Sequence, residues 1–229
     1  MNLTNYYWYF QSAIPERICD DIVKYGHQLQ HQMAVTGGYG DGKKLNQKQI
    51  KDLKTKRDSN IVWMSDRWIY KEIQPYVHRA NQSAGWNYEW DFSESCQFTK
   101  YQPGQFYGWH ADGNSCHFGK YKRWIPGVSP VDKTTGKAPR GYTENPNMVG
   151  KVRKLSITIN LNKPGEYDGG NLKFDFGPHA DIKRYHECEE IRPQGSVIIF
   201  PSFVYHCVTP VTRGTRYSLV LWTLGDPFK

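Results

Sequence analysis

Short segments in which apolar and polar residues alternate make up most of the chain from residue 86 onward. Alternation with a period of two places successive side chains on opposite faces of a strand. Turn-forming residues separate these segments, and many short strands with turns between them favour a sandwich or jelly roll. We therefore predict a mainly β fold with flanking helices rather than a parallel sheet with crossover helices. The alternating segments are residues 86–92, 95–102, 154–162, 171–176, 196–200 and 215–222.

The first third of the chain is predicted to supply helices. Residues 15–30 predict a helix, because Pro15 suits a first turn and apolar residues recur at helical spacing. A second helix is predicted within residues 61–85. Residues 37–60 are rich in Gly, Lys, Asn and Gln and predict a loop. The apolar residues expected to face inward are Ile18, Ile22 and Val23 in the first helix and Trp68, Ile69 and Ile73 in the second.

The length of the chain fits a single domain. A β-rich domain of 229 residues can bury an adequate core, and we find no internal repeat or low-complexity tract. We expect residues 1–85 to form a helical N-terminal support and residues 86–229 to form the jelly-roll core. The predicted domain is therefore the whole chain, residues 1–229.

Net charge and cysteine content bear on the binding partners and the cellular compartment of the protein. A net charge of +8 favours acidic partners, but much of it lies in two polar stretches that we interpret as solvated loops, so nucleic acid is not indicated. The five cysteines show no paired spacing, which argues for reduced thiols. The first residues lack the features of a signal peptide, and no stretch has the apolar length of a membrane span. We expect a soluble, cytoplasmic protein without a membrane partner.

Two histidines and one aspartate form the most informative pattern. His110 and Asp112 stand in an H-x-D pair, and an extended segment would place both side chains on the same face. His206 follows the apolar segment 196–200 and a proline, and would reach the pair from a distant strand. Two imidazoles and one carboxylate are the ligands that hold non-haem Fe(II) and leave coordination positions open. An H-x-D pair alone also arises by chance, and a lone strand histidine more often packs than binds metal.

Arg216 lies ten residues after His206 and begins an alternating segment. An arginine on a buried strand is costly unless an anion pairs with it. A dicarboxylate co-substrate would supply that anion and form a bidentate, charge-assisted pair. Ser218, two residues further along the same face, either adds a hydroxyl to this site or faces solvent.

These residues give the chain a family resemblance. An H-x-D pair, a distal histidine and an arginine ten positions later followed by x-Ser resemble the Fe(II)/2-oxoglutarate-dependent dioxygenases. The motif Y-x-x-G-Q-x-Y-x-x-H-x-D at residues 101–112 is similar to the prolyl 4-hydroxylase branch and its bacterial and viral relatives. The similarity runs from Phe98 to Trp222 with an insertion. It implies a double-stranded β-helix, which is a cupin-like jelly roll.

The resemblance also implies an activity and its cofactors. Such an enzyme oxidises its substrate with O₂ while it converts 2-oxoglutarate to succinate and CO₂, and ascorbate is a candidate reductant. The implied ligands of Fe(II) are His110, Asp112 and His206. The implied contacts of 2-oxoglutarate are Arg216, Ser218 and Tyr101, where Tyr101 could instead be a core aromatic.

Three further matches imply a peptide or protein substrate with proline as the target. Tyr107 matches the second tyrosine of the motif, near the hydroxylated ring. Arg153 matches a peptide-contacting arginine, although it could be solvated within the run KVRK. Trp222 matches a tryptophan beside the substrate proline, although it could belong to the core. Collagen-type prolyl hydroxylases usually have lysine where Arg216 stands, so a collagen-like repeat substrate is not implied.

Residues 113–150 interrupt the rhythm of the strands with many Lys, Pro, Gly, Asn and Thr residues. A loop of this length in a compact domain is usually a functional lid or is disordered. Because it starts directly after Asp112, we expect it to overhang the metal. Trp124 would either cap a bound ligand or anchor the loop onto the barrel.

Two other functions stay open at this point. Demethylases of alkylated nucleic acid also carry Y-x-x-G before H-x-D, but they have a longer gap between the distal histidine and the anchoring arginine. The same chemistry could act on a small molecule. A cupin-like binding module with a structural or vestigial metal is the non-enzymatic alternative, and the intact ligand set argues against it. His27 and His31 have helical i, i+4 spacing but no third ligand, so we interpret them as structural.

Overall fold

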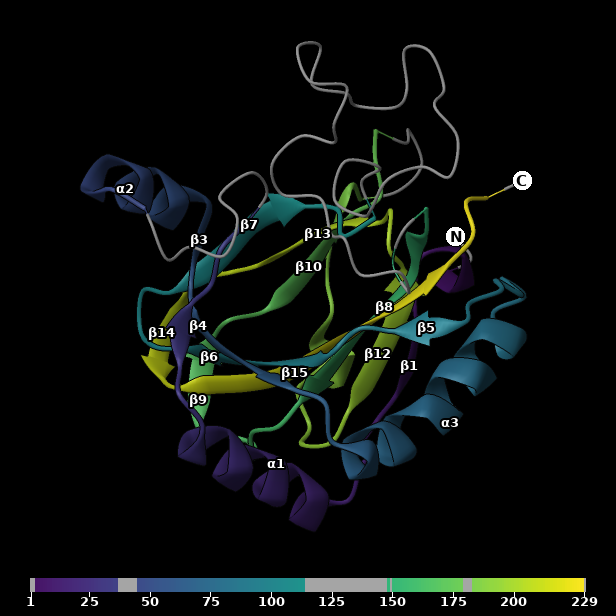
Figure 1. Ribbon diagram of the computed structural model, residues 1–229, viewed down its shortest axis with the longest axis horizontal. Coiled ribbons are helices and arrows are strands. Elements are labelled where there is room, and N and C mark those ends of the chain that lie inside the picture. Colours follow the sequence, from purple (N-terminus) through teal and green to yellow (C-terminus); the bar gives the residue numbers. More distant parts are fainter. Residues whose placement is uncertain (1–2, 37–44, 114–147, 149, 179–182, 229) are drawn as a thin grey trace.

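The computed structural model describes residues 3–36, 45–113, 148, 150–178 and 183–228. Its main feature is a pair of antiparallel sheets that lie face to face (Figure 1). The larger sheet has eight strands. Their spatial order is β1 (Trp8–Phe10), β12 (Val197–Pro201), β8 (Val152–Asn160), β15 (Arg216–Gly225), β6 (Cys96–Tyr101), β4 (Asn60–Met64) and β2 (Gln32–Met33), with β5 (Phe92–Ser93) also paired to β15.

The smaller sheet has five strands. Their order is β11 (Tyr185–Glu187), β10 (Leu172–Asp175), β13 (Tyr205–Val208), β7 (Phe106–His110) and β3 (Arg57–Asp58). A separate ribbon joins β14 (Val211–Gly214) to β9 (Tyr167–Gly169). Buried side chains of both sheets, such as Phe174 and Phe200, form one apolar cluster between them. This is the predicted double-stranded β-helix, with alternate strand residues facing the space between the sheets.

Two helices cover the outer face of the larger sheet (Figure 1). These are α1 (Glu16–Gln28) and α3 (Arg67–Ser83), and their apolar residues share a second core cluster with β4, β6, β8, β12 and β15. In α1 the inward residues are Ile18 and Ile22, with Val23 partly buried, as the helical spacing predicts. Both helices therefore pack on the larger sheet through their apolar residues.

The second predicted helix, at residues 61–85, is wrong at its start. Residues 60–64 form strand β4, and the helix begins only at Arg67, after Asp66. The sequence Ile-Val-Trp-Met suits a strand better than a first helical turn, since β-branched and aromatic side chains pack well on a sheet. Ile69 and Ile73 face the core as expected, but Trp68 is 38% exposed and does not point inward.

The loop predicted at 37–60 is also wrong for most of the residues described. Residues 47–56 form helix α2 (Gln47–Lys56), which lies beside β3 and β7. Its start has a capping box, in which Asn46 and Gln49 exchange side chain-to-backbone hydrogen bonds of 2.9 Å. Only Leu53 of this helix is buried. A polar, lysine-rich composition fits a solvent-facing helix as well as a loop, so composition alone does not distinguish the two structures.

The strand predicted at 86–92 is present only at its end, in β5. Asn87 has a φ of 51°, a left-handed conformation that interrupts an extended run. The alternating aromatic residues Trp86, Tyr88 and Trp90 pack against the outer core cluster without forming a strand. Alternation here therefore reflects packing on one side of a loop.

Two smaller expectations concern cysteines and membranes. The four cysteines within the described residues form no disulfide. No helix in that same part of the chain is both long enough and apolar enough to cross a membrane. The expected lid at 113–150 and its Trp124 lie almost entirely outside the described residues, as does Cys116.

Candidate metal and co-substrate site

His110, Asp112 and His206 come together at one end of the smaller sheet. His110 ends β7 and is paired in register with His206 of β13. Nε2 of His110 lies 3.5 Å from Oδ1 of Asp112, and Nε2 of His206 lies 3.6 Å from Oδ2 of the same carboxylate. One ligand atom from each residue lies within 4.8 Å of the others. This grouping is close enough for three ligands to share one metal ion.

Backbone carbonyls fix the orientation of both imidazoles. Nδ1 of His110 lies 2.8 Å from the carbonyl oxygen of Gly108, and Nδ1 of His206 lies 2.9 Å from that of Val204. In a neutral imidazole each Nδ1–H then donates to the carbonyl, so each Nε2 keeps its lone pair on the side of Asp112. A hydrogen bond of this kind on the second nitrogen is typical of histidines that bind metals.

Asp112 is held in an ionised, buried state. Burial alone would raise the pKa of its carboxyl, but His206 and His110 outweigh this effect and hold the pKa well below its usual range. Oδ2 accepts a hydrogen bond of 2.8 Å from Ser156, whose hydroxyl is 2.9 Å from that of Ser202. Burial and the neighbouring His110 lower the pKa of His206 to about 4. At neutral pH this histidine is therefore uncharged, as a metal ligand must be.

Arg216 lies at the start of β15, opposite Tyr101 of β6. Its side chain is almost fully buried, with 2% of the residue exposed. Space for it depends on Gly170, where an added Cβ would lie 2.9 Å from the Arg216 Cδ. The guanidinium is 5.5 Å from the centre of the Tyr101 ring, and its Nη1 donates a 3.3 Å hydrogen bond to Ser218. Ser218 is itself buried, so it does not face solvent.

The guanidinium of Arg216 has no anionic partner within the described part of the chain. Its Nε is buried without a hydrogen-bond acceptor, and its one side-chain hydrogen bond is the one to Ser218. Burying a guanidinium without an anion lowers the stability of the folded protein, so the presence of Arg216 here indicates a binding site for an anion. It lines the same cavity as the three candidate metal ligands. A two-histidine, one-carboxylate donor set beside an unpaired arginine fits Fe(II) together with a dicarboxylate.

Tyr107 forms one wall of this cavity. Its ring is stacked on the imidazole of His110, with centroids 3.6 Å apart and planes 15° apart. The guanidinium of Arg57 also lies over the Tyr107 ring, 4.3 Å from the ring centre. Burial raises the pKa of Tyr107 to about 12, so its phenol remains protonated and can donate a hydrogen bond.

Trp222 forms another wall and is 5% exposed. Its indole nitrogen has no hydrogen-bond acceptor in the described structure. Arg153 lies 3.9 Å from the Trp222 ring centre, and its Nη2 donates a 2.7 Å hydrogen bond to Glu94. A second hydrogen bond joins the Arg153 Nε to Glu94, so the pair is bidentate. Arg153 is therefore not solvated, and it supports Trp222 while it neutralises a buried carboxylate.

Three residues of the site escaped the sequence analysis. Arg57 lies in the segment interpreted as a loop, and it reaches the cavity because β3 pairs with β7. Glu94 precedes β6, and nothing in the local pattern connects it with Arg153. Ser156 could have been found, since the predicted strand at 154–162 carries polar residues on its inward face.

The other histidines that the structure describes do not form a second metal group. His31 lies beyond the end of α1, and its ring centroid is 6.1 Å from that of His27. His186 contacts the hydroxyl of Tyr7. Within the described residues the only cluster suited to a metal is the one around Asp112.

Comparison with known sequences decides the family. A sequence profile described as the 2OG-Fe(II) oxygenase superfamily matches residues 96–224, which is more than half of the chain. The chain belongs to the 2OG-Fe(II) oxygenase superfamily. Membership implies Fe(II) and 2-oxoglutarate as the metal and co-substrate, in agreement with the donor set. The matched residues contain all three candidate metal ligands and Arg216.

Individual relatives resemble this superfamily member over part of their length. PKHD-type hydroxylase YbiX of Escherichia coli and of Escherichia fergusonii is 33% identical over 128 residues, which is 55% of this chain. The match covers 40% of the length of those relatives.

Solved structures share the fold at lower identity. A Pseudomonas putida prolyl-4-hydroxylase aligns with 99% of this chain and 96% of its own, with a TM-score of 0.58 and 20% identity. A viral collagen prolyl hydroxylase from Paramecium Bursaria Chlorella virus-1 aligns with 96% of both chains, with a TM-score of 0.57 and 17% identity. A Trichoplax adhaerens prolyl hydroxylase, in complex with a hypoxia inducible factor peptide fragment, covers 96% of this chain and 84% of its own, with a TM-score of 0.57 and 14% identity. These likenesses establish the double-stranded β-helix.

Proposed function

We propose that the chain is a non-haem Fe(II)- and 2-oxoglutarate-dependent dioxygenase that hydroxylates a peptidyl substrate at proline and releases succinate and CO₂. The observation that carries this proposal is the unpaired, buried guanidinium of Arg216 in the cavity of His110, Asp112 and His206. A structural metal site of a binding module needs no such cation. The charge is explained once a dicarboxylate is part of the active complex.

In this proposal the metal ligands are His110, Asp112 and His206. The backbone hydrogen bonds on both Nδ1 atoms would present neutral Nε2 atoms to the ion, and Asp112 would supply the negative charge. When bound, Fe(II) supplies the activation of O₂ that couples decarboxylation of 2-oxoglutarate to oxidation of the substrate. The protein orients the reactants and keeps water out of the cavity.

The co-substrate residues would be Arg216, Ser218 and Tyr101. Arg216 would receive the carboxylate of 2-oxoglutarate that is remote from the metal, through a bidentate pair of charged hydrogen bonds. The hydroxyl of Ser218 already touches this guanidinium and would hold its plane in position. Tyr101 is buried opposite Arg216 and would offer its phenol to the same ligand.

The substrate residues would be Tyr107, Trp222 and Arg153. A prolyl ring is apolar and stacks on aromatic faces, while the carbonyl groups of a peptide need donors. The protonated phenol of Tyr107 and the unpartnered indole nitrogen of Trp222 are two donors on the cavity wall. Arg153 would hold the Trp222 ring in place through its 3.9 Å contact. Three relatives by fold are named as prolyl hydroxylases, and one of them binds a peptide, which supports this substrate class.

Several finer expectations belong to the same proposal. The chain would act as one domain, with residues 113–150 and Trp124 covering the bound substrate. Ascorbate would serve as a reductant, and the protein would work in the cytoplasm without nucleic-acid or membrane partners.

The substrate class can be tested by mass spectrometry. The protein is incubated in air with Fe(II), 2-oxoglutarate and a library of proline-containing peptides, each matched by a peptide in which alanine replaces proline. We expect a gain of one oxygen only in proline peptides, together with succinate, and no gain with Asp112→Ala. Parallel reactions contain a methylated oligonucleotide or free proline. Oxidation restricted to either of these would overturn the peptidyl assignment, and absence of succinate from every reaction would favour a binding module.

A further inference from the structure

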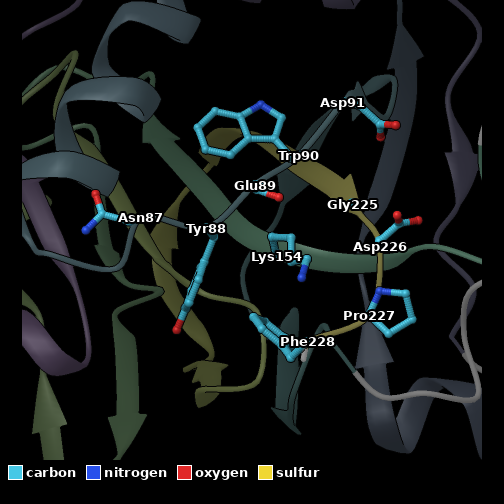
Figure 2. Close-up of a pocket in the computed structure, with 10 residues that line it drawn as sticks. All are labelled: Asn87, Tyr88, Glu89, Trp90, Asp91, Lys154, Gly225, Asp226, Pro227 and Phe228. Carbon is cyan, nitrogen blue, oxygen red and sulfur yellow. The ribbon is translucent and has the colours of Figure 1, made fainter.

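A second cavity lies near the start of β8 and the end of β15, and it shares no lining residue with the metal site. It has a volume of about 320 Å³ and lies between residues 87–91 and residues 225–228, with Lys154 as its floor (Figure 2). The pairing of β8 with β15 shifts between Leu155 and Arg153, so Lys154 is the extra residue of a bulge. A bulge re-aims side chains, and here it directs Arg153 toward Trp222 and Lys154 into the second cavity.

Lys154 is largely buried, and its side chain lines the cavity. The residue is 5% exposed, and its Nζ lies 3.7 Å from the centre of the Phe228 ring. No carboxylate within the described parts of the chain forms an ion pair with it at 4 Å or less. Burial lowers the pKa of Lys154, and the carboxylates of Asp226 and Glu89 oppose this effect from a greater distance. A cation that lines a cavity without an ion-pair partner can form a charge-assisted pair with an anionic group of a ligand.

The rim of the same cavity carries the opposite charge. Glu89 and Asp226 are both exposed there, and Figure 2 shows them on two sides of Lys154. Asp91 lies in the same lining, and its carboxylate is 2.5 Å from Nζ of Lys151. A simple anion would meet repulsion from the rim, and a simple amine would meet repulsion from the floor. The two charges together select a ligand that carries both signs.

Aromatic rings supply the remaining walls. The rings of Tyr88 and Phe228 meet edge to face with centroids 5.1 Å apart. Trp90 belongs to the same lining, and its ring is 4.8 Å from that of His78. Such walls suit an apolar group between the two charged ends of a ligand. The volume of the cavity is at the lower end of the range of small-molecule sites.

We propose that this cavity binds a free α-amino acid with an apolar side chain. The ligand's carboxylate pairs with Lys154, its ammonium pairs with Glu89, and its side chain packs against Tyr88 and Phe228. This site is separate from the oxygenase cavity and does not depend on the reaction proposed for it. No metal or co-substrate is needed for binding.

Isothermal titration of the metal-free protein tests the proposal with three probes that share one apolar body. L-Phenylalanine carries both charges, 3-phenylpropanoate lacks the ammonium, and phenethylamine lacks the carboxylate. We expect saturable binding of L-phenylalanine at one site, and affinities at least about tenfold lower for the other two probes, because each loses one charged pair.

Variants assign the binding to this cavity. Lys154→Gln should lower the affinity for L-phenylalanine about tenfold or more, while Lys24→Gln removes the same charge from the exposed side of α1, away from the cavity, and should leave the affinity unchanged. Glu89→Gln changes an exposed side chain, so the variant should fold like wild type. It should lower the affinity for L-phenylalanine but not the affinity for 3-phenylpropanoate. The proposal is overturned if L-phenylalanine does not bind at millimolar concentration. It is equally overturned if both Lys154→Gln and Glu89→Gln bind as wild type, or if 3-phenylpropanoate binds wild type as tightly as L-phenylalanine.

Discussion

The hydroxyl of Ser156 lies 2.8 Å from Oδ2 of Asp112 and donates a hydrogen bond to it. Ser156 is fully buried on the inward face of β8, where its own oxygen contacts Ser202. A carboxylate held in this way cannot rotate freely, so its oxygens stay directed toward His110 and His206. The larger sheet therefore orients a ligand that the smaller sheet brings into place.

Ser156→Ala should lower the affinity for Fe(II) by about 10- to 100-fold, the usual effect of removing a group that orients a metal ligand. Anaerobic titration with Fe(II) measures this directly. Ser218→Ala is the matched control, since Ser218 is equally buried but touches Arg216 rather than Asp112. Equal Fe(II) affinity in Ser156→Ala and wild type would contradict the orienting role.

Arg216→Ala should weaken the binding of 2-oxoglutarate by roughly 2–5 kcal/mol, because a buried, charged hydrogen-bonded pair is lost. Arg216→Lys keeps the charge but loses the planar fork, so it should recover only part of this affinity. Calorimetry with the anaerobic Fe(II)-loaded protein gives both values, and thermal unfolding checks that each variant is folded. An unchanged constant in Arg216→Ala would remove this residue from the co-substrate site.

Tyr107→Phe and Trp222→Phe should separate two activities. Both residues line the cavity without being candidate metal ligands, and each substitution removes a donor while it keeps an aromatic ring. Decarboxylation of 2-oxoglutarate without substrate should persist, while hydroxylation of a peptide should fall strongly. Succinate and oxidised peptide are measured in the same reactions. A parallel loss of both activities would mean that these side chains support the metal site or the fold.

The metal-free protein should lose stability as the pH falls from 6.5 toward 4. The pKa of His206 is lowered from 6.5 to about 4, so the unfolded chain takes up a proton in this window and the folded protein does not. The free energy of unfolding then decreases by about 1.4 kcal/mol per pH unit through this group. Denaturant unfolding across the window should show a steeper decrease in wild type than in His206→Gln. Parallel curves for the two proteins would contradict the lowered pKa.

Much of the site could be predicted because its signals are local. The H-x-D spacing keeps His110, which ends β7, and Asp112, in the bend that follows, close together at the end of one strand, and the pairing of β7 with β13 brings His206 opposite His110. Arg216 and Ser218 share a face of β15 for the same period-two reason. The contacts that escaped prediction are not local. Glu94 meets Arg153 across 59 positions of sequence, and only the folded sheets bring them together.

The fold was predictable where burial dictates the pattern and less so at the surface. The strands of the core, such as β8 and β12, are apolar on one or both faces and were recognised. Helix α2 buries only Leu53, so its sequence has almost no apolar periodicity to detect. Trp68 was expected to face inward because it is large and apolar, but the face of α3 that packs on the sheet is set by Ile69 and Ile73.

Formation of succinate from 2-oxoglutarate tests the central claim most directly. Wild-type protein with Fe(II) and O₂ should produce succinate, and it should produce only background amounts without Fe(II). His110→Ala, Asp112→Ala and His206→Ala should each reduce succinate to that background while thermal unfolding remains cooperative, because no remaining ligand can replace the one removed. If any two of these variants form succinate at close to the wild-type rate, the cavity between the two sheets is not the iron site.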